Sequence, residues 1–142
     1  MKKLLKLLSL VLIAIVVASS GMFDTMQQGG IEFKQISLEQ AQKEAQKSNK
    51  IIFIDAYASW CGPCKKMAAT SFKDEGVGEI FNKQFINLKI DCEKDADGPE
   101  ISRRYKISAY PTLLFIDADG KLKKQIVGFQ TPERLKVIAG SF

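Results

Sequence analysis

The pattern of apolar and polar residues divides the chain into short strand-like runs and segments with helical spacing. The strand-like runs are rich in β-branched and aromatic residues or alternate between apolar and polar positions. Two of them flank Asp119-Gly120, a pair that is typical of a hairpin turn. The expected strands cover residues 31–36, 50–57, 85–91, 112–117 and 121–128.

Helices are expected between these strands. Ser37, with Gln40 three residues later, is typical of a capping box, which predicts a helix to Ser48 with Asn49 as its stop. Thr131-Pro132 predicts the start of a last helix. The other expected helices cover residues 61–72, 77–83 and 99–105, with a break at 74–76 and a polar loop at 92–98. The order β-α-β-α-β-α-β-β-α predicts an α/β fold in which helices cover both faces of a mixed central sheet.

The N-terminal part of the chain has a different pattern. Three lysines in residues 1–6 precede an apolar stretch from Leu7 to Ala18, and small residues follow it. This arrangement is typical of a secretory signal peptide, and the stretch is short for a membrane-spanning helix, which needs about 20 residues. We expect a signal peptide at 1–20, cleaved or kept as a membrane anchor, then a flexible leader at 21–30 and one domain at 31–142.

Much of the net charge of +5 comes from this N-terminal segment. Residues 1–20 hold three basic and no acidic residues, so the rest of the chain carries 18 basic and 16 acidic ones. The resulting charge of +2 gives no case for nucleic acid binding. Export would place the domain where disulfides can form, although three cysteines are too few for a disulfide-stabilised scaffold.

Two of the cysteines, Cys61 and Cys64, stand between an expected buried strand and an expected helix. A Cys-x-x-Cys in that position can close a small disulfide ring or hold two thiols side by side, and it is typical of redox sites. A helix N-terminus lowers the pKa of the first thiol, which makes Cys61 the candidate nucleophile. A structural disulfide and a copper(I) site are the alternatives. Structural zinc needs four Cys or His ligands, and the chain has three Cys and no His.

The sequence Trp60-Cys61-Gly62-Pro63-Cys64 resembles the active site of the thioredoxin family. Asp55, six residues before Cys61, falls where thioredoxins carry a buried acid, and Tyr110-Pro111 resembles the family's cis-proline segment. The resemblance covers roughly residues 31–142 and implies the thioredoxin fold, with Cys61–Cys64 as a redox-active disulfide.

The resemblance also implies a role for each of these residues. Cys61 would be the exposed nucleophile at the helix start, and Cys64 the more buried thiol that resolves the mixed disulfide. Asp55 would accept the proton of Cys64 through water, and burial in an apolar strand should raise its pKa. The alternative for Asp55 is a solvated acid at the end of the strand.

Thioredoxins often place a buried lysine beside this acid. The matching position looks like Asn87, and we expect strand parity to keep Lys89 from replacing that lysine. The coupling between the acid and a lysine is therefore expected to be missing.

Substrate contacts are expected around the dithiol. A cis bond before Pro111 would turn the backbone of Tyr110 toward an extended substrate segment, which could pair with it as an added strand. The expected contact residues are Trp60, Gly62, Pro63, Tyr110 and Pro111.

Two further residues are harder to assign. Gly128, after the last strand, would allow close approach of a substrate or would simply end the strand. Cys92 is expected to be a buried, inert thiol, and a surface thiol open to modification is the alternative.

The Gly-Pro pair between the cysteines and the absence of histidine favour a reducing dithiol with a potential of about −270 mV, as in thioredoxin. We expect a monomeric protein-disulfide reductase without cofactor or metal, exported to a compartment such as the bacterial periplasm. Disulfide-containing exported proteins would be its substrates, and a membrane-borne donor would supply its electrons. The alternatives are a disulfide oxidase or isomerase of the same fold and a non-enzymatic module that binds a partner or copper(I).

Overall fold

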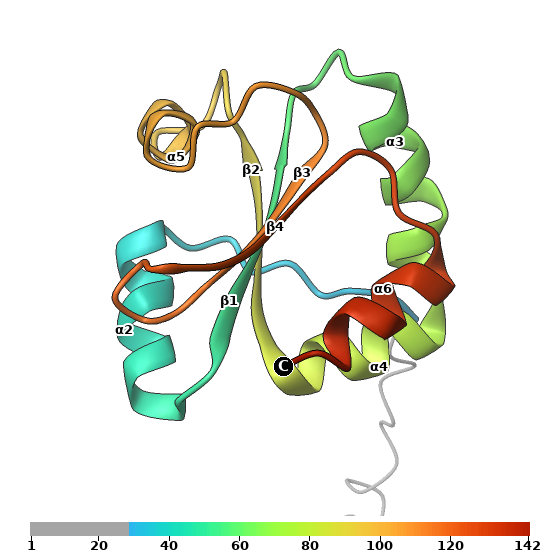
Figure 1. Ribbon diagram of the computed structural model, residues 1–142, viewed down its shortest axis with the longest axis horizontal. Helices are drawn as coiled ribbons and strands as arrows, with labels where there is room; N and C mark the ends of the chain where they lie inside the picture. Colours follow the sequence, from blue (N-terminus) through green and yellow to red (C-terminus); the bar gives the residue numbers. More distant parts are fainter. Residues whose placement is uncertain (1–28) are drawn as a thin grey trace, which may run out of the picture.

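The computed structural model describes residues 29–142, so the expected signal peptide and residues 21–28 of the expected leader lie outside the described part (Figure 1). Within residues 29–142, no helix is both long and apolar enough to cross a membrane.

A four-stranded mixed sheet forms the centre of the domain, as the element order predicted. The strand order is β2-β1-β3-β4. β1 (Ile51–Tyr57) runs parallel to β2 (Phe85–Asp91), and it pairs antiparallel with β3 (Thr112–Ile116). β3 continues through the Asp119-Gly120 turn into β4 (Leu122–Val127), which completes the hairpin. β1 is therefore a central strand, and its side chains are covered on both faces.

Helices cover both faces of this sheet (Figure 1). On one face, α2 (Leu38–Ser48) and α5 (Gly98–Arg104) pack against an aliphatic core. On the other, α3 (Gly62–Ala69), α4 (Glu75–Gln84) and α6 (Pro132–Ala139) pack against a core rich in phenylalanine. The α/β architecture expected from the sequence is thus confirmed.

Local signals placed most helix ends correctly. The Ser37 capping box is formed, Asn49 ends α2 in the left-handed conformation, and Thr131 caps α6. Two expectations need correction. The helix expected over 61–72 ends at Ala69, and a short 3-10 turn, η2 (Ser71–Lys73), follows it. The break expected at 74–76 is instead a helix start, because the Asp74 side chain accepts a hydrogen bond from the Val77 N–H.

The strand expected at 31–36 is not present, although its residues lie beside β2. Lys34 N–H donates to the Asn87 carbonyl, but the neighbouring backbone groups are bound by side-chain amides instead of a strand ladder. Asn82 Oδ1 accepts from Glu32 N–H at 2.9 Å, and Asn87 Nδ2 lies 3.4 Å from the Glu32 carbonyl. The alternating pattern therefore reports a half-buried extended segment whose hydrogen bonds go partly to side chains and partly to separate backbone groups, without a regular strand ladder.

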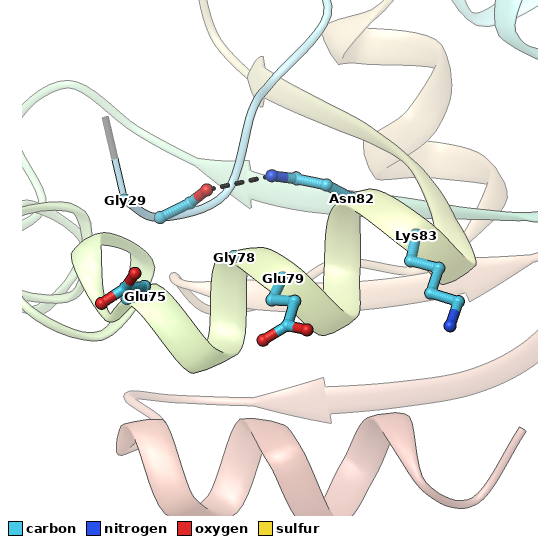
Figure 2. A pocket seen from close by; sticks show the side chains of 7 residues that line it. Gly29, Glu75, Gly78, Glu79, Asn82 and Lys83 are labelled. Carbon is cyan, nitrogen blue, oxygen red and sulfur yellow. Dashed lines mark hydrogen bonds between the residues drawn. The ribbon is translucent and has the colours of Figure 1, made fainter. Parts of the chain in front are cut away.

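Gly29 and Gly30, the last residues of the expected leader, pack on α4. Asn82 Nδ2 donates to the Gly30 carbonyl at 3.1 Å (Figure 2). A Cβ on Gly78 would come within 2.2 Å of the same carbonyl oxygen, so this close approach requires glycine there. An open cavity of about 380 Å³ lies beside this contact and is lined from α4 mainly by Glu75, Glu79 and Lys83. None of the expected site residues lines it.

Candidate active site

The two motif cysteines lie where β1 leads into α3. Cys61 is the N-cap of α3, and its Sγ accepts a hydrogen bond from the Cys64 N–H at 3.2 Å. Pro63 occupies the first turn, where the missing N–H costs nothing. Cys61 and Cys64 form a disulfide with an S–S distance of 2.07 Å. The local sequence therefore places a sulfur atom at the positive end of a helix, where a thiolate is stabilised.

The expected difference in exposure between the two cysteines is not found. Cys61 is 3% exposed and Cys64 is 2% exposed, and both form a buried cluster with Ala58 against which Tyr57 and Tyr110 pack. Gly62 and Pro63 between them are exposed, and open space surrounds the position of a Cβ on Gly62. In this oxidised state, a partner would thus meet the Gly-Pro bridge before the sulfur atoms.

Asp55 is fully buried in the middle of β1, as the resemblance implied. Burial raises its pKa, while the nearby Lys89 ammonium lowers it and only partly offsets the effect of burial. One carboxylate oxygen, Oδ2, accepts a hydrogen bond from Lys89 Nζ at 2.5 Å. The solvated acid considered as an alternative is therefore excluded.

The expectation that strand parity excludes Lys89 is wrong. Residues 87 and 89 are two apart, so their side chains point to the same face of β2. The parallel register pairs Asp55 with Lys89, and Asn87 lies opposite Phe53 instead. The acid–lysine coupling is thus present, and Asn87 binds Asn82 and the N-terminal segment.

Trp60 and Tyr110 form an aromatic pair beside the disulfide. Trp60 is 67% exposed, and its ring meets that of Tyr110 edge-on with centroids 6.0 Å apart. Trp60 Nε1 donates to Glu93 Oε2 at 2.9 Å. The two rings lie beside the disulfide as expected, and their contact with a substrate stays a prediction. Glu93 was not anticipated, since it is 33 residues away in the chain and lies in a polar loop without a motif.

The Tyr110-Pro111 peptide bond is cis, as expected from the resemblance. The Pro111 carbonyl accepts a hydrogen bond from the Gly128 N–H at 2.7 Å, which brings the end of β4 to this segment. Gly128 has φ of 94°, a conformation that favours glycine, and open space surrounds its Cβ position. This geometry fits both interpretations of Gly128, namely a residue that allows close approach of a substrate and a glycine that simply ends the strand.

Cys92 is a buried thiol at the end of β2, as expected. Burial raises its pKa, which disfavours the reactive thiolate. Among residues 29–142 there is no group of three or more His, Cys, Asp or Glu side chains that could hold a metal ion.

A thioredoxin-like domain matches residues 38–140 of the chain. The protein belongs to the thioredoxin-like family. The match does not include residues 29–37, the segment whose backbone is hydrogen-bonded by the side-chain amides of Asn82 and Asn87.

Curated relatives share parts of this domain. Thioredoxin-1 of Drosophila melanogaster is 35% identical over 74 residues, which are 52% of this chain and 64% of the relative. The thiol:disulfide interchange protein DsbD of Colwellia psychrerythraea is 33% identical over 105 residues, which are 68% of this chain and 17% of the relative. The chain spans only 53% to 64% of the length of the first curated relatives that it matches.

Solved structures support the same assignment. A candidate disulphide-isomerase from Bacteroides thetaiotaomicron is 41% identical, with a TM-score of 0.69 over 79% of this chain and 93% of that one. The DsbH oxidoreductase has a TM-score of 0.67 over 84% of this chain and 91% of that one. At 19% identity, that second likeness supports the fold alone.

Proposed function

We propose that this protein is a thiol-disulfide oxidoreductase that reduces protein disulfides outside the cytoplasm. One observation carries the proposal. Cys61 caps the start of α3 and is disulfide-bonded to Cys64 within the helix, and the strand that leads to them holds the buried carboxylate of Asp55. The family membership and the relatives described as thioredoxins and as a thiol:disulfide interchange protein support the same chemistry.

The reaction has two exchange steps in the reduced protein. The Cys61 thiolate attacks one sulfur of the substrate disulfide, forming a mixed disulfide and releasing the first substrate thiolate, which takes up a proton. Cys64 then loses its proton to the Asp55 carboxylate and attacks the Cys61 sulfur. The second substrate thiolate leaves, two electrons have passed to the substrate, and the disulfide seen here remains.

The direction of electron flow rests on the motif. A Gly-Pro bridge without a nearby histidine favours a potential of about −270 mV, as in thioredoxin. Regeneration outside the cytoplasm would then require a membrane-borne electron donor. Export itself rests on the pattern of residues 1–20.

An isomerase is the second candidate, because the 41% identical Bacteroides structure is described as a candidate disulphide-isomerase. The potential of the Cys61–Cys64 couple, measured by equilibration with glutathione, separates the two functions. We expect a value near about −270 mV, and a value above about −180 mV would reject the reductase.

A trapping experiment identifies the substrates. Cys64→Ser removes the resolving thiol, so mixed disulfides at Cys61 should accumulate and can be identified by mass spectrometry. Cys92→Ser in the same background is the control and should leave the trapped set unchanged. A trapped set that persists after Cys61→Ser would contradict the assignment of the nucleophile.

A further inference from the structure

An acidic side chain lies on one side of the disulfide. Glu93 belongs to the loop that follows β2, and its Oε2 accepts the hydrogen bond of Trp60 Nε1 at 2.9 Å. The Trp60 ring in turn meets that of Tyr110, which packs against the buried cluster of the two cysteines. The hydrogen bond therefore places the Glu93 carboxylate beside an exposed ring that is predicted to contact the substrate.

A basic side chain lies on the other side. Lys66 is an exposed residue of α3, and its Nζ lies 5.1 Å from the centroid of the Phe129 ring. Phe129 follows Gly128, whose N–H donates to the carbonyl of Pro111 beside the cis bond. Figure 1 shows the segment between β4 and α6 running past α3. This contact thus joins the Lys66 ammonium to the cis-proline segment.

The strand order separates these two charges. β2 and β4 form the two edges of the sheet, and β1, which leads to Cys61, lies between them. β1, β2 and β4 run in the same direction, because β1 is parallel to β2 while the β1–β3 and β3–β4 pairs are antiparallel. Their carboxyl ends therefore lie at one end of the sheet, with Glu93 beyond one edge, Phe129 beyond the other and the disulfide between them.

Both charges are available to a partner. Glu93 and Lys66 are exposed, and neither takes part in an ion pair within residues 29–142. The exposed surface at this end also includes apolar side chains, since Trp60 is 67% exposed and Val127 is 54% exposed. A bound segment would therefore meet apolar contacts near its reacting cysteine and one charge of each sign farther out.

Other charged side chains at this end do not cancel the arrangement. Lys65 precedes Lys66 on α3 and adds a positive charge on the same side. Lys94 and Asp95 follow Glu93 in the loop and carry opposite charges. The side of β2 is therefore net negative, and the side of α3 is net positive.

We propose that Glu93 and Lys66 determine the preferred direction and charge of the bound substrate segment. The preferred segment is extended, with a basic residue on the Glu93 side of its reacting cysteine and an acidic residue on the Lys66 side. A segment bound in the opposite direction would bring like charges together, which costs affinity. The inference deepens the proposed function and rests on it, because the substrate is held at Cys61 as a mixed disulfide.

The test is a competition between two peptides for Cys61 in the Cys64→Ser protein. Both peptides have the same composition and one cysteine. One has a lysine two residues before the cysteine and a glutamate two residues after it, and the other has the two exchanged, because side chains two apart in an extended segment share a face. Each exchange puts one peptide on Cys61 and releases the other as its thiol, so no net oxidation occurs. One peptide is isotope-labelled, and mass spectrometry gives their ratio on Cys61 at equilibrium.

We expect one peptide to exceed the other on Cys61 by about fivefold at low ionic strength. In about 1 M salt the ratio should fall toward one, because the charges are screened. Glu93→Lys combined with Lys66→Glu keeps the net charge and should invert the preference. The matched control exchanges two exposed charges on α4, Glu79→Lys with Lys83→Glu, and should leave the preference as it was.

Two single variants keep the test decisive if the doubly changed protein is unstable. Glu93→Gln, which retains the acceptor for Trp60 Nε1, and Lys66→Met should each reduce the preference to about twofold. Equal amounts of the two peptides on the Cys64→Ser protein, or a preference that these variants leave as it was, would overturn the inference and leave the proposed function intact. A protein that takes neither peptide on Cys61 would contradict the proposed function itself.

Discussion

The disulfide region follows β1, the Asp55–Lys89 pair joins β1 to β2, and the two regions differ in their contact with solvent. Trp60, Gly62 and Pro63 are exposed beside the disulfide. Asp55 is fully buried, and its pairing with Lys89 offsets part of a large desolvation cost. Changes in the first region should therefore alter reactivity with little effect on stability, whereas changes in the second should alter both.

The largest expected effect is the loss of the nucleophile. Cys61→Ser should reduce insulin disulfide reduction by about a thousandfold or more, since no other thiol stands at the helix start. Far-ultraviolet circular dichroism should be unchanged. Cys92→Ser, which removes the buried thiol, is the matched control and should keep nearly full activity. Comparable losses in both variants would contradict the assignment of Cys61.

Breaking the ion pair should cost stability. Lys89→Met leaves the Asp55 carboxylate buried without its cation, which we expect to lower the free energy of unfolding at pH 7 by about 3 kcal/mol. Urea denaturation measures this change. Asp55→Asn in the Lys89→Met background removes the buried charge and should recover most of the loss. If the single variant is as stable as the wild type, the pair does not contribute as inferred.

The pH dependence of stability follows from the raised pKa of Asp55. Between the unfolded and the folded pKa the folded protein binds more protons, so the contribution of Asp55 to stability falls as pH rises through this window. Asp55→Asn should therefore be more stable than wild type at pH 7, and this difference should shrink toward pH 4. Urea midpoints at both pH values test this, and a difference that is constant or grows toward pH 4 would refute it.

The smallest expected change in stability lies at the exposed aromatic ring. Trp60→Ala should shift the free energy of unfolding by less than about 0.5 kcal/mol, because the ring is 67% exposed. Its kcat/KM for a protein disulfide should fall about tenfold, with little change for a small aromatic disulfide. Glu93→Gln keeps the hydrogen bond acceptor for Trp60 Nε1 and should retain most activity. Equal losses on both substrates would show that Trp60 acts on the disulfide itself rather than on substrate binding.

Local sequence signals were sufficient to predict most of the fold. The capping box at Ser37, the Thr131-Pro132 start and the Asp119-Gly120 turn fix backbone conformation within a few residues, so they were found without tertiary information. The prediction of a strand at 31–36 was wrong, because the alternation of apolar and polar residues there reflects burial of one side of the segment. Whether such a segment joins a sheet depends on its neighbours, and here Asn82 and Asn87 take part of its hydrogen bonding.

The residues of the candidate site likewise separate into those that short sequence segments predict and those that only the tertiary structure brings together. By itself, the sequence determined the Cys-x-x-Cys pair at a helix start and, through the family resemblance, the buried acid and the cis-proline, because these are properties of short contiguous segments. Only the tertiary structure decided that Lys89 faces Asp55, that Glu93 binds Trp60 and that Lys66 lies over the Phe129 ring. These contacts join residues that are far apart in the chain, and strand register and packing, not local propensity, bring them together.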